Sequence, residues 1–379
     1  MKKIFVWSPF IDYVGTTKST LNSLLSISKF GNNLFNLTVI NVFGEWDNYS
    51  KILKKNKINT INLNISKNIP LVKNKGFIFS RLMYLKVFFL SFFPLIKILR
   101  NEKPDYLYVC LITILPLIIN YLFDFKTKLI LRISGYPNLH IIRKIIWNIV
   151  LKKIEWVFSP TNITDKFLIE NFPNHKNKIK LIRDPIFNYN DIFIIKKLRK
   201  NKRRNFFLAV GRLTRQKNFS FLIKTVHKYN SSNKDKINLF ILGEGEEKKY
   251  LNNLIVNLQL NKNVKLLGFK KNIKKYMCEA KALMCSSLWE DPGFIFIEAG
   301  ICNLPVISNA CPNGPLEIFD KEINGFMFNY NSSKDFEKKI NEMKNSKTDT
   351  LKRKVWNLKR YSKNYSIIRF FKNFNQYVY

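Results

Sequence analysis

Hydrophobic runs of strand length recur along the chain and are separated by longer segments with helical spacing of apolar residues. In the first half the strand-like runs cover residues 2–7, 37–43, 58–63, 106–111 and 129–134. In the second half they cover residues 206–211, 239–242, 264–269, 282–285 and 305–308. Residues 18–29, 293–302 and the tail from 351 favour helices. This alternation predicts an α/β protein with parallel sheets rather than a repeat array.

Length and composition are consistent with this prediction. The 379 residues suffice for two domains, and a hydrophobic content of 46% suits globular cores. The five cysteines form no C-x-x-C pair, which favours reduced thiols in a cytosol. The three histidines are scattered, so no histidine-based metal site is expected.

The net charge of +39 leaves several partners open: nucleic acid, an anionic membrane or phosphorylated small molecules. A Lys-, Asn- and Ile-rich composition imposed across a whole genome explains the charge equally well. The most basic run, Lys196 to Arg204, has no interleaved aromatic residues and lies between the predicted domains. We interpret it as a solvated linker and expect no nucleic-acid partner.

Three segments bear on membranes. The apolar part of the N-terminus is too short for a signal peptide. Residues Tyr106 to Phe123 carry no charge but are interrupted by Pro116 and Asn120, and we interpret them as a buried strand followed by a buried helix. The segment from Phe77 to Arg100 is rich in aromatic and basic residues. It fits either a helix that lies on a membrane or a core helix.

The stretch from Cys285 to Ser308 contains the candidate chemistry. Its pattern predicts a strand, a loop, a helix and a second strand, with the loop at the carboxyl edge of the sheet, where α/β folds bind ligands. Glu290 would lie in the loop and Glu298 in the helix. The amides of Gly293 and Phe294 would point out of the helix start, where they suit a phosphate.

These residues resemble the E-x7-E signature of retaining glycosyltransferases of family 4, which have the GT-B fold of two facing Rossmann-like domains. Two further stretches carry the resemblance: VGRLTRQKN at residues 210–218, and SNACPNGPLE at residues 308–317, similar to transferases that build bacterial surface glycans. Asn303 stands where relatives usually have glycine, and asparagine tolerates the left-handed conformation that ends such a helix. The resemblance covers most of residues 206–328 and is loose over residues 1–185.

The resemblance implies a division of the chain and a role for each part. Residues 1–185 would bind the acceptor, residues 186–350 would bind the nucleotide sugar, and residues 351–379 would form a C-terminal helix packing back on the first domain. Gly15 stands where a glycine pair usually approaches the donor diphosphate, with Val14 before it. The loop from Arg132 to Asn138 would face the donor sugar, although Ser134 and Gly135 stand where many relatives have histidine.

Within the second domain the resemblance assigns donor contacts. Arg212 and Lys217 would hold the diphosphate as it gathers negative charge. Glu298 would bind the ribose hydroxyls and Glu290 the donor sugar, and Phe269 with Lys270 would flank the nucleobase. The G-x-G step at residues 243–245 would be structural. No D-x-D motif is present, so we expect the two cations to replace a divalent metal and we expect no cofactor.

The sequence therefore predicts a retaining, metal-independent glycosyltransferase of surface polysaccharide biosynthesis. It would move a sugar from a nucleotide sugar, UDP-linked rather than GDP-linked, to a glycan or lipid-linked acceptor. We expect it in the cytoplasm, peripherally on the anionic inner face of the plasma membrane. Two alternatives stay open: a GT-B nucleotide-sugar epimerase, which needs no acceptor, and a basic nucleic-acid-binding protein, whose binding would depend steeply on salt.

Overall fold

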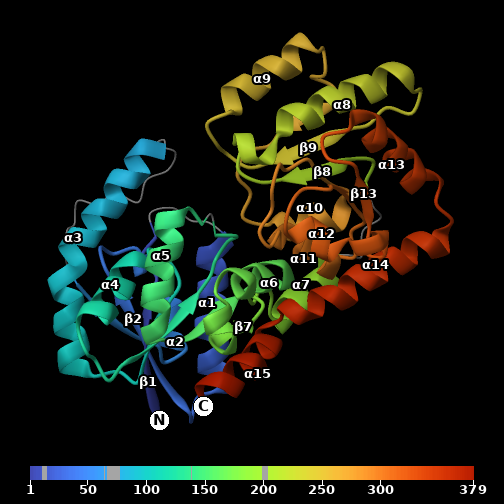
Figure 1. Cartoon of the computed structure of the whole chain (residues 1–379). Helices are drawn as coiled ribbons and strands as arrows, with labels where there is room; N and C mark the ends of the chain where they lie inside the picture. Colours follow the sequence, from blue (N-terminus) through green and yellow to red (C-terminus); the bar gives the residue numbers. More distant parts are fainter. Residues whose placement is uncertain (11–14, 64, 66–76, 138, 199–203) are drawn as a thin grey trace. The chain divides into compact units, whose positions relative to one another are not determined.

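The computed structural model describes residues 1–10, 15–63, 65, 77–137, 139–198 and 204–379 (Figure 1). The chain forms two compact units, Met1–Ile186 with Tyr365–Tyr379, and Phe187–Asn364. The first boundary lies one residue after the expected one, at 186 instead of 185.

The tail returns to the first unit later than the sequence predicts, at residue 365 instead of 351. The reason is that α14 (Thr348–Ser362) packs on α11 (Phe294–Ile301) of the second unit. The approach is close, since a Cβ at Gly300 of α11 would lie 2.2 Å from the Ser362 Oγ. Only α15 (Ile367–Val378) packs back on the first unit, where the Ser26 Oγ donates to the Ile367 carbonyl at 2.5 Å.

The first unit is built on a parallel sheet of seven strands within the described residues. The strands are β1 (Lys2–Trp7), β2 (Phe35–Asn41), β3 (Asn59–Asn62), β4 (Tyr106–Val109), β5 (Lys128–Arg132), β6 (Ile154–Ser159) and β7 (Ile179–Leu181). Their order is β3-β2-β1-β4-β5-β6-β7, so the winding reverses between β1 and β4. Strand β2 ends before the predicted Phe43, because the Glu45 carboxylate accepts the Val42 and Phe43 amides at 2.9–3.1 Å.

Helices cover both faces of this sheet. The helices are α1 (Gly15–Phe30), α2 (Ser50–Lys55) and α15 on one face, and α3 (Phe77–Glu102), α4 (Ile114–Leu122), α5 (Ile141–Val150) and α6 (Asn162–Asn171) on the other. Alternate residues of β1 show the two layers: Ile4 and Val6 share a core with α1 and α15, whereas Phe5 and Trp7 share a core with α3 to α6.

The uncharged segment from Tyr106 to Phe123 is a strand followed by a helix, as predicted. All four residues of β4 are buried. Helix α4 is only partly buried, because Tyr121 and Leu122 are exposed. Among the residues that the structure describes, one helical segment, Leu82–Glu102 of α3, is long and apolar enough to cross a membrane by length and composition.

The second unit contains a parallel sheet of six strands among the residues described. They are β8 (Phe207–Val210), β9 (Leu239–Leu242), β10 (Val264–Leu266), β11 (Leu283–Cys285), β12 (Val306–Asn309) and β13 (Phe326–Phe328), in the order β10-β9-β8-β11-β12-β13. The helices are α7 (Tyr189–Leu198), α8 (Phe219–Ser232), α9 (Lys248–Asn257), α10 (Ile273–Glu279), α11, α12 (Gly314–Ile318), α13 (Ser333–Asn345) and α14. Here the winding reverses between β8 and β11.

Two predictions on this unit have different outcomes. Asn303 adopts the left-handed conformation after α11, with φ of 50°, which confirms the prediction made for that position. The basic run Lys196 to Arg204 begins in the last turn of α7, but residues 199–203 lie outside the described residues. Its interpretation as a solvated linker stays a prediction.

Candidate active site

The second unit offers a binding position at the reversal point of its sheet. Strands β8 and β11 are neighbours there, and the loops that follow them leave the sheet at the same carboxyl edge. In open α/β sheets this crevice is where ligands bind. The loop after β8 carries Arg212 and Lys217, and the loop after β11 carries Glu290. The structure thus brings three predicted site residues to one edge.

Lys217 and Glu290 form an ion pair across this reversal point. The Lys217 Nζ lies 2.5 Å from the Glu290 Oε1, and the Ser287 Oγ donates to the same oxygen at 2.5 Å. The Glu290 side chain is 7% exposed and the Lys217 side chain 16% exposed. The Lys217 ammonium is therefore still accessible to solvent, whereas the Glu290 carboxylate is buried and accepts the hydrogen bond from Ser287.

A buried thiol completes the surroundings of this carboxylate. The Cys285 Sγ donates to the Glu290 Oε1 at 3.9 Å. Burial raises the pKa of Cys285 to about 11, and the neighbouring Glu290 carboxylate adds to the rise. Because the thiol stays protonated at neutral pH, Cys285 acts as a weak donor rather than as a nucleophile.

Hydrogen bonds between the two loops fix the pair in place. The Leu288 amide donates to the Gln216 carbonyl at 2.8 Å, and the Gln216 Nε2 donates to the Trp289 carbonyl at 3.0 Å. The Ser286 Oγ donates to the Lys217 carbonyl at 2.9 Å. The two loops therefore behave as one element, and a displacement of either would move both charges.

A third loop, which follows β12, supports the backbone of Glu290. The Gly314 amide donates to the Glu290 carbonyl at 2.9 Å, and the Asn309 Nδ2 donates to the Ser287 carbonyl at 2.9 Å. A Cβ at Gly314 would lie 2.1 Å from the Pro292 carbonyl oxygen, so only glycine fits there. The sequence resemblance located this loop but gave no role to Ser287, Asn309 or Gly314.

Arg212 differs from Lys217 although both occupy one loop. Its side chain is exposed, and within the described residues its guanidinium has no ion-pair partner. The loop after β9 packs against the backbone on either side of Arg212 through the two glycines of the G-x-G step. A Cβ at Gly243 would lie 1.8 Å from the Gly211 carbonyl oxygen, and a Cβ at Gly245 would lie 2.3 Å from the Leu213 carbonyl oxygen. These distances agree with a structural role for the two glycines.

Phe269 and Lys270 follow β10 at the same edge of the sheet. The Phe269 side chain is 69% exposed, and Lys270 is partly exposed. The preceding Gly268 accepts a hydrogen bond from the Gly243 amide at 3.0 Å, which joins this loop to the loop after β9. Since β10 is two strands from β8, these residues lie about 10 Å along the edge from it.

Helix α11 carries the remaining donor-site candidates of this unit. Gly293 is its N-terminal cap with φ of 81°, and Phe294 is its first residue. A Cβ at Gly293 would lie 2.6 Å from the Phe296 ring, so a side chain is not tolerated. Glu298 lies in the second turn and is partly buried.

Gly15 belongs to the other unit, where it is the exposed first residue of α1. Val14 before it lies outside the described residues. The last residue of β5 has unexpected surroundings, because Arg132 is buried. It donates to the Asp184 Oδ1 at 2.6 Å, the Thr20 Oγ1 at 2.8 Å and the Ser19 Oγ at 2.5 Å. Nothing in the sequence pairs residues so far apart, and this cluster connects β5 to α1 and to the segment after β7.

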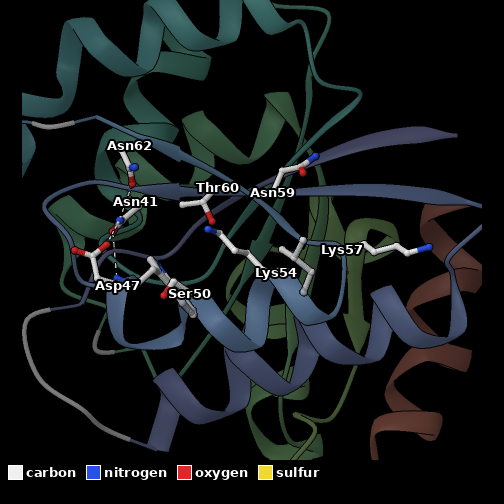
Figure 2. A pocket seen from close by; sticks show the side chains of 10 residues that line it. Asn41, Asp47, Ser50, Lys54, Lys57, Asn59, Thr60 and Asn62 are labelled. Atoms are coloured by element: carbon white, nitrogen blue, oxygen red, sulfur yellow. Dashed lines mark hydrogen bonds between the residues drawn. The ribbon is translucent and has the colours of Figure 1, made fainter.

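The first unit also has a polar pocket beside its edge strand (Figure 2). Asn41 and Asn62 end β2 and β3, and the Asn41 Nδ2 donates to the Asn62 Oδ1 and the Asp47 Oδ1 at 2.8 Å. Lys54 and Thr60 also line this pocket. Amide, hydroxyl and ammonium groups of this kind suit a ligand rich in hydroxyl or anionic groups.

The described residues contain no group of three or more His, Cys, Asp or Glu side chains placed to hold a metal ion. The metal independence of the reaction stays a prediction.

The second unit is similar in sequence to a known family. The sequence model described as Glycosyl transferases group 1 matches residues 190–364. An uncharacterized glycosyltransferase of Methanocaldococcus jannaschii is 32% identical over 252 residues, which are 61% of this chain and 62% of that protein.

A second relative has a more specific name. The N-acetylgalactosamine-N,N'-diacetylbacillosaminyl-diphospho-undecaprenol 4-alpha-N-acetylgalactosaminyltransferase of Campylobacter jejuni is 27% identical over 223 residues, 54% of this chain and 57% of that protein. The chain thus spans less than two thirds of the length of either relative.

Solved structures extend the likeness to the whole chain. The crystal structure of HepE from Anabaena in complex with UDP and glucose superposes with a TM-score of 0.69 over 99% of this chain and 98% of HepE. The two sequences are 15% identical, so this likeness shows the fold alone. The chain has the GT-B fold, and its residues 190–364 match the sequence model of the group 1 glycosyl transferases.

Proposed function

We propose that this protein is a retaining, metal-independent glycosyltransferase of family 4 that moves a sugar from a UDP-sugar to a glycan or lipid-linked acceptor. The observation that carries the proposal is the Lys217–Glu290 pair at the reversal point of the sheet, with Arg212 in the same loop. This arrangement lies within the part of the chain that matches the family.

The two cations would act on the leaving group. A nucleoside diphosphate gathers negative charge as the glycosidic bond breaks, and preorganised cations stabilise that charge. Arg212 would hold phosphate oxygens in a bidentate manner and Lys217 would act as a point charge. An ammonium has three donors, so Lys217 keeps hydrogens for a phosphate while one remains on Glu290.

The two carboxylates would act on the two sugars of the donor. Glu290 would hold a hydroxyl of the transferred sugar or favour positive charge on its ring, and the loops that fix its backbone support such a role. Glu298 on α11 would accept hydrogen bonds from the ribose hydroxyls. The exposed ring of Phe269, with Lys270, would contact the nucleobase.

The choice of donor and acceptor is supported by the relatives. HepE is solved with UDP and glucose, and the Campylobacter jejuni relative is named for a diphospho-undecaprenol-linked acceptor. The polar pocket beside β2 and β3 (Figure 2) would take part of the acceptor glycan. A surface-glycan substrate is therefore the acceptor class to test.

A thermal-shift panel with UDP, GDP and ADP tests the donor site, because a ligand of the native state raises the melting temperature. We expect UDP to give the largest shift and the Arg212→Ala and Lys217→Ala variants to lose it. Lys228→Ala is the matched control, since Lys228 is an exposed lysine of α8 paired with Glu337. Equal shifts in all variants would contradict the assigned diphosphate site.

Product analysis tests the reaction. Consumption of UDP-sugar only when a glycan acceptor is present indicates a transferase, whereas conversion without acceptor indicates an epimerase. The anomeric configuration of the product, read by NMR, decides whether the reaction retains stereochemistry. Activity should survive EDTA; a complete loss that manganese or magnesium restores would show that the two cations are not enough.

A further inference from the structure

Helix α5 exposes an unusual amount of apolar surface. Only Trp147 and Val150 of its residues are buried. The exposed isoleucines are Ile141, Ile142, Ile145, Ile146 and Ile149, whose spacing gathers them into one stripe along the helix. Ile141 and Ile142 are 81% and 73% exposed. Single exposed apolar residues are ordinary on soluble proteins, but a contiguous stripe marks a binding surface.

Helix α3 presents a second stripe on the same side of the sheet. Leu82, Leu85, Phe89 and Phe93 are exposed and recur every three or four residues. Helix α4 packs against both α3 and α5, so the three helices cover one face of the first unit (Figure 1). We call the four α3 residues and the five isoleucines of α5 the apolar face.

The other side of α3 is packed into the protein. Val87, Leu95 and Leu99 are buried in the core that α3 to α6 form with the sheet. A helix that crosses a membrane would have lipid or helices around it, whereas α3 has the core on one side and its apolar stripe on the other. The core-helix interpretation of the segment from Phe77 to Arg100 therefore holds for one side of α3. The membrane interpretation stays a prediction for its exposed apolar side.

The charges around the apolar face are basic. Lys86 and Lys97 on α3 and Arg143 and Lys144 on α5 are all exposed. The sequence has no acidic residue from 77 to 101 or from 139 to 154. Glu102 and Glu155 are the nearest acids along the chain, and both lie toward the amino edge of the sheet, at the end of α3 and at the start of β6.

We infer that the apolar face of α3 and α5 inserts into an anionic membrane surface. Apolar side chains rimmed by Lys and Arg fit the boundary between acyl chains and anionic headgroups. A second copy of the chain fits less well, because symmetric pairing would set basic residues against the same basic residues.

The face is also suitably placed for chemistry at a membrane. Helix α5 runs from the carboxyl end of β5 toward the start of β6, so Ile141 and Ile142 lie near the carboxyl edge of the sheet. That edge is where α/β units bind ligands. A membrane held there would bring lipid headgroups beside the edge of the first unit. Lipid binding itself requires no donor, so the inference stands apart from the proposed reaction.

Co-sedimentation with vesicles of equal parts phosphatidylglycerol and phosphatidylcholine tests the inference. Because hydrophobic insertion contributes together with charge, replacing Ile142 and Ile146 together by serine should weaken partitioning by about tenfold or more. The matched control replaces Tyr250 and Val256, two exposed apolar residues of α9 in the second unit, by serine. The control should bind vesicles as the wild type does, and melting curves should show that both variants fold.

A fluorescent label reports insertion directly. The five native cysteines are buried, so an Ile145→Cys variant offers a reactive exposed thiol for an environment-sensitive dye. We expect a blue shift of the dye on adding vesicles, and no shift with a Val256→Cys control. Either of two results would overturn the inference. One is the absence of a dye shift at position 145. The other is a serine variant that binds vesicles as the wild type does but loses a dimer that the wild type forms in sedimentation velocity.

Discussion

The two units each place a charged pair at the carboxyl edge of a parallel sheet, but they bury it to different extents. In the first unit Arg132 and Asp184 are both 2% exposed, and the guanidinium also donates to the Ser19 and Thr20 hydroxyls. In the second unit Lys217 remains 16% exposed beside the buried Glu290. The same kind of sheet edge thus carries a fully buried ion pair in the first unit and an ion pair with a partly solvent-exposed lysine in the second.

The difference shows what each pair can do. Burial raises the cost of separating Arg132 from Asp184, because either charge alone would lack solvation. Each of the three guanidinium nitrogens donates within the cluster, and the side chain is 2% exposed, so a ligand has no access to it. Lys217 is a compact ammonium with hydrogens to share and solvent beside it. We therefore expect the first pair to determine stability and the second to determine activity.

The largest expected effect is on stability, from Arg132→Leu. The change leaves the Asp184 carboxylate buried and unpaired, which should lower the free energy of unfolding by about 3–5 kcal/mol. Urea unfolding followed by tryptophan fluorescence measures this, since Trp7, Trp46, Trp147 and Trp156 all lie in the first unit.

Two variants sharpen this result. Replacing Asp184 by leucine as well should recover much of the loss, because an apolar pair leaves no charge without a partner. Lys128→Ala breaks the exposed pair with Glu155 and should cost less than about 1 kcal/mol. An Arg132→Leu variant as stable as Lys128→Ala would show that the buried pair is not structural.

The next effect is on turnover, from Glu290→Gln. A carboxylate that stabilises the transition state acts mainly on kcat, so we expect kcat to fall on the order of tenfold to a thousandfold. Steady-state kinetics with varied donor measures it. The melting temperature should change little, because the carbonyl oxygen of glutamine can still accept from Lys217 and Ser287. Normal kcat with a lowered melting temperature would make this pair structural, like the first.

A buried carboxyl of the first unit extends the comparison to pH. Burial raises the pKa of Glu45 from 4.5 to about 7. Between these values the folded protein holds a proton that the unfolded chain has released, so stability falls as pH rises through that window. Glu45→Gln cannot titrate, so relative to the wild type it should gain about 3 kcal/mol from pH 4.5 to 7. Parallel stability curves for the two proteins would contradict the raised pKa.

The sequence predicted the second unit more fully than the first, for physical reasons. The positions of Arg212, Lys217 and Glu290 follow from short loops beside buried strands, and such loops are local in sequence. The left-handed Asn303 was predictable because a helix end restricts the residues that fit there. The Arg132–Asp184 pair and the later return of the tail depend on contacts between distant segments, which no local pattern encodes.

The supporting contacts of the site were missed for the same reason. Ser287 donates to a carboxylate three residues away, which a local pattern can predict. Asn309 at the end of β12 and Gly314 at the start of α12 reach the Glu290 loop from a distant segment. The α5 part of the apolar face also escaped prediction, because the exposure of its isoleucines depends on how distant segments pack.

The smallest expected effect is on donor affinity, from Glu298→Ala. Glu298 lies in the second turn of α11, on an element whose ends are fixed by Gly293 and Asn303, so its position should survive the change. Its contact with ribose hydroxyls would exist in both the ground state and the transition state, and losing it should raise the donor KM by about tenfold with kcat nearly constant. The matched control is Glu342→Ala, an exposed carboxylate on α13 paired with Lys339, which should leave both constants unchanged. Kinetics with varied donor on the wild type and the two variants tests this role. A fall in kcat for Glu298→Ala equal to that for Glu290→Gln would mean that both carboxylates act on the transferred sugar. An unchanged KM for Glu298→Ala would remove Glu298 from the donor site.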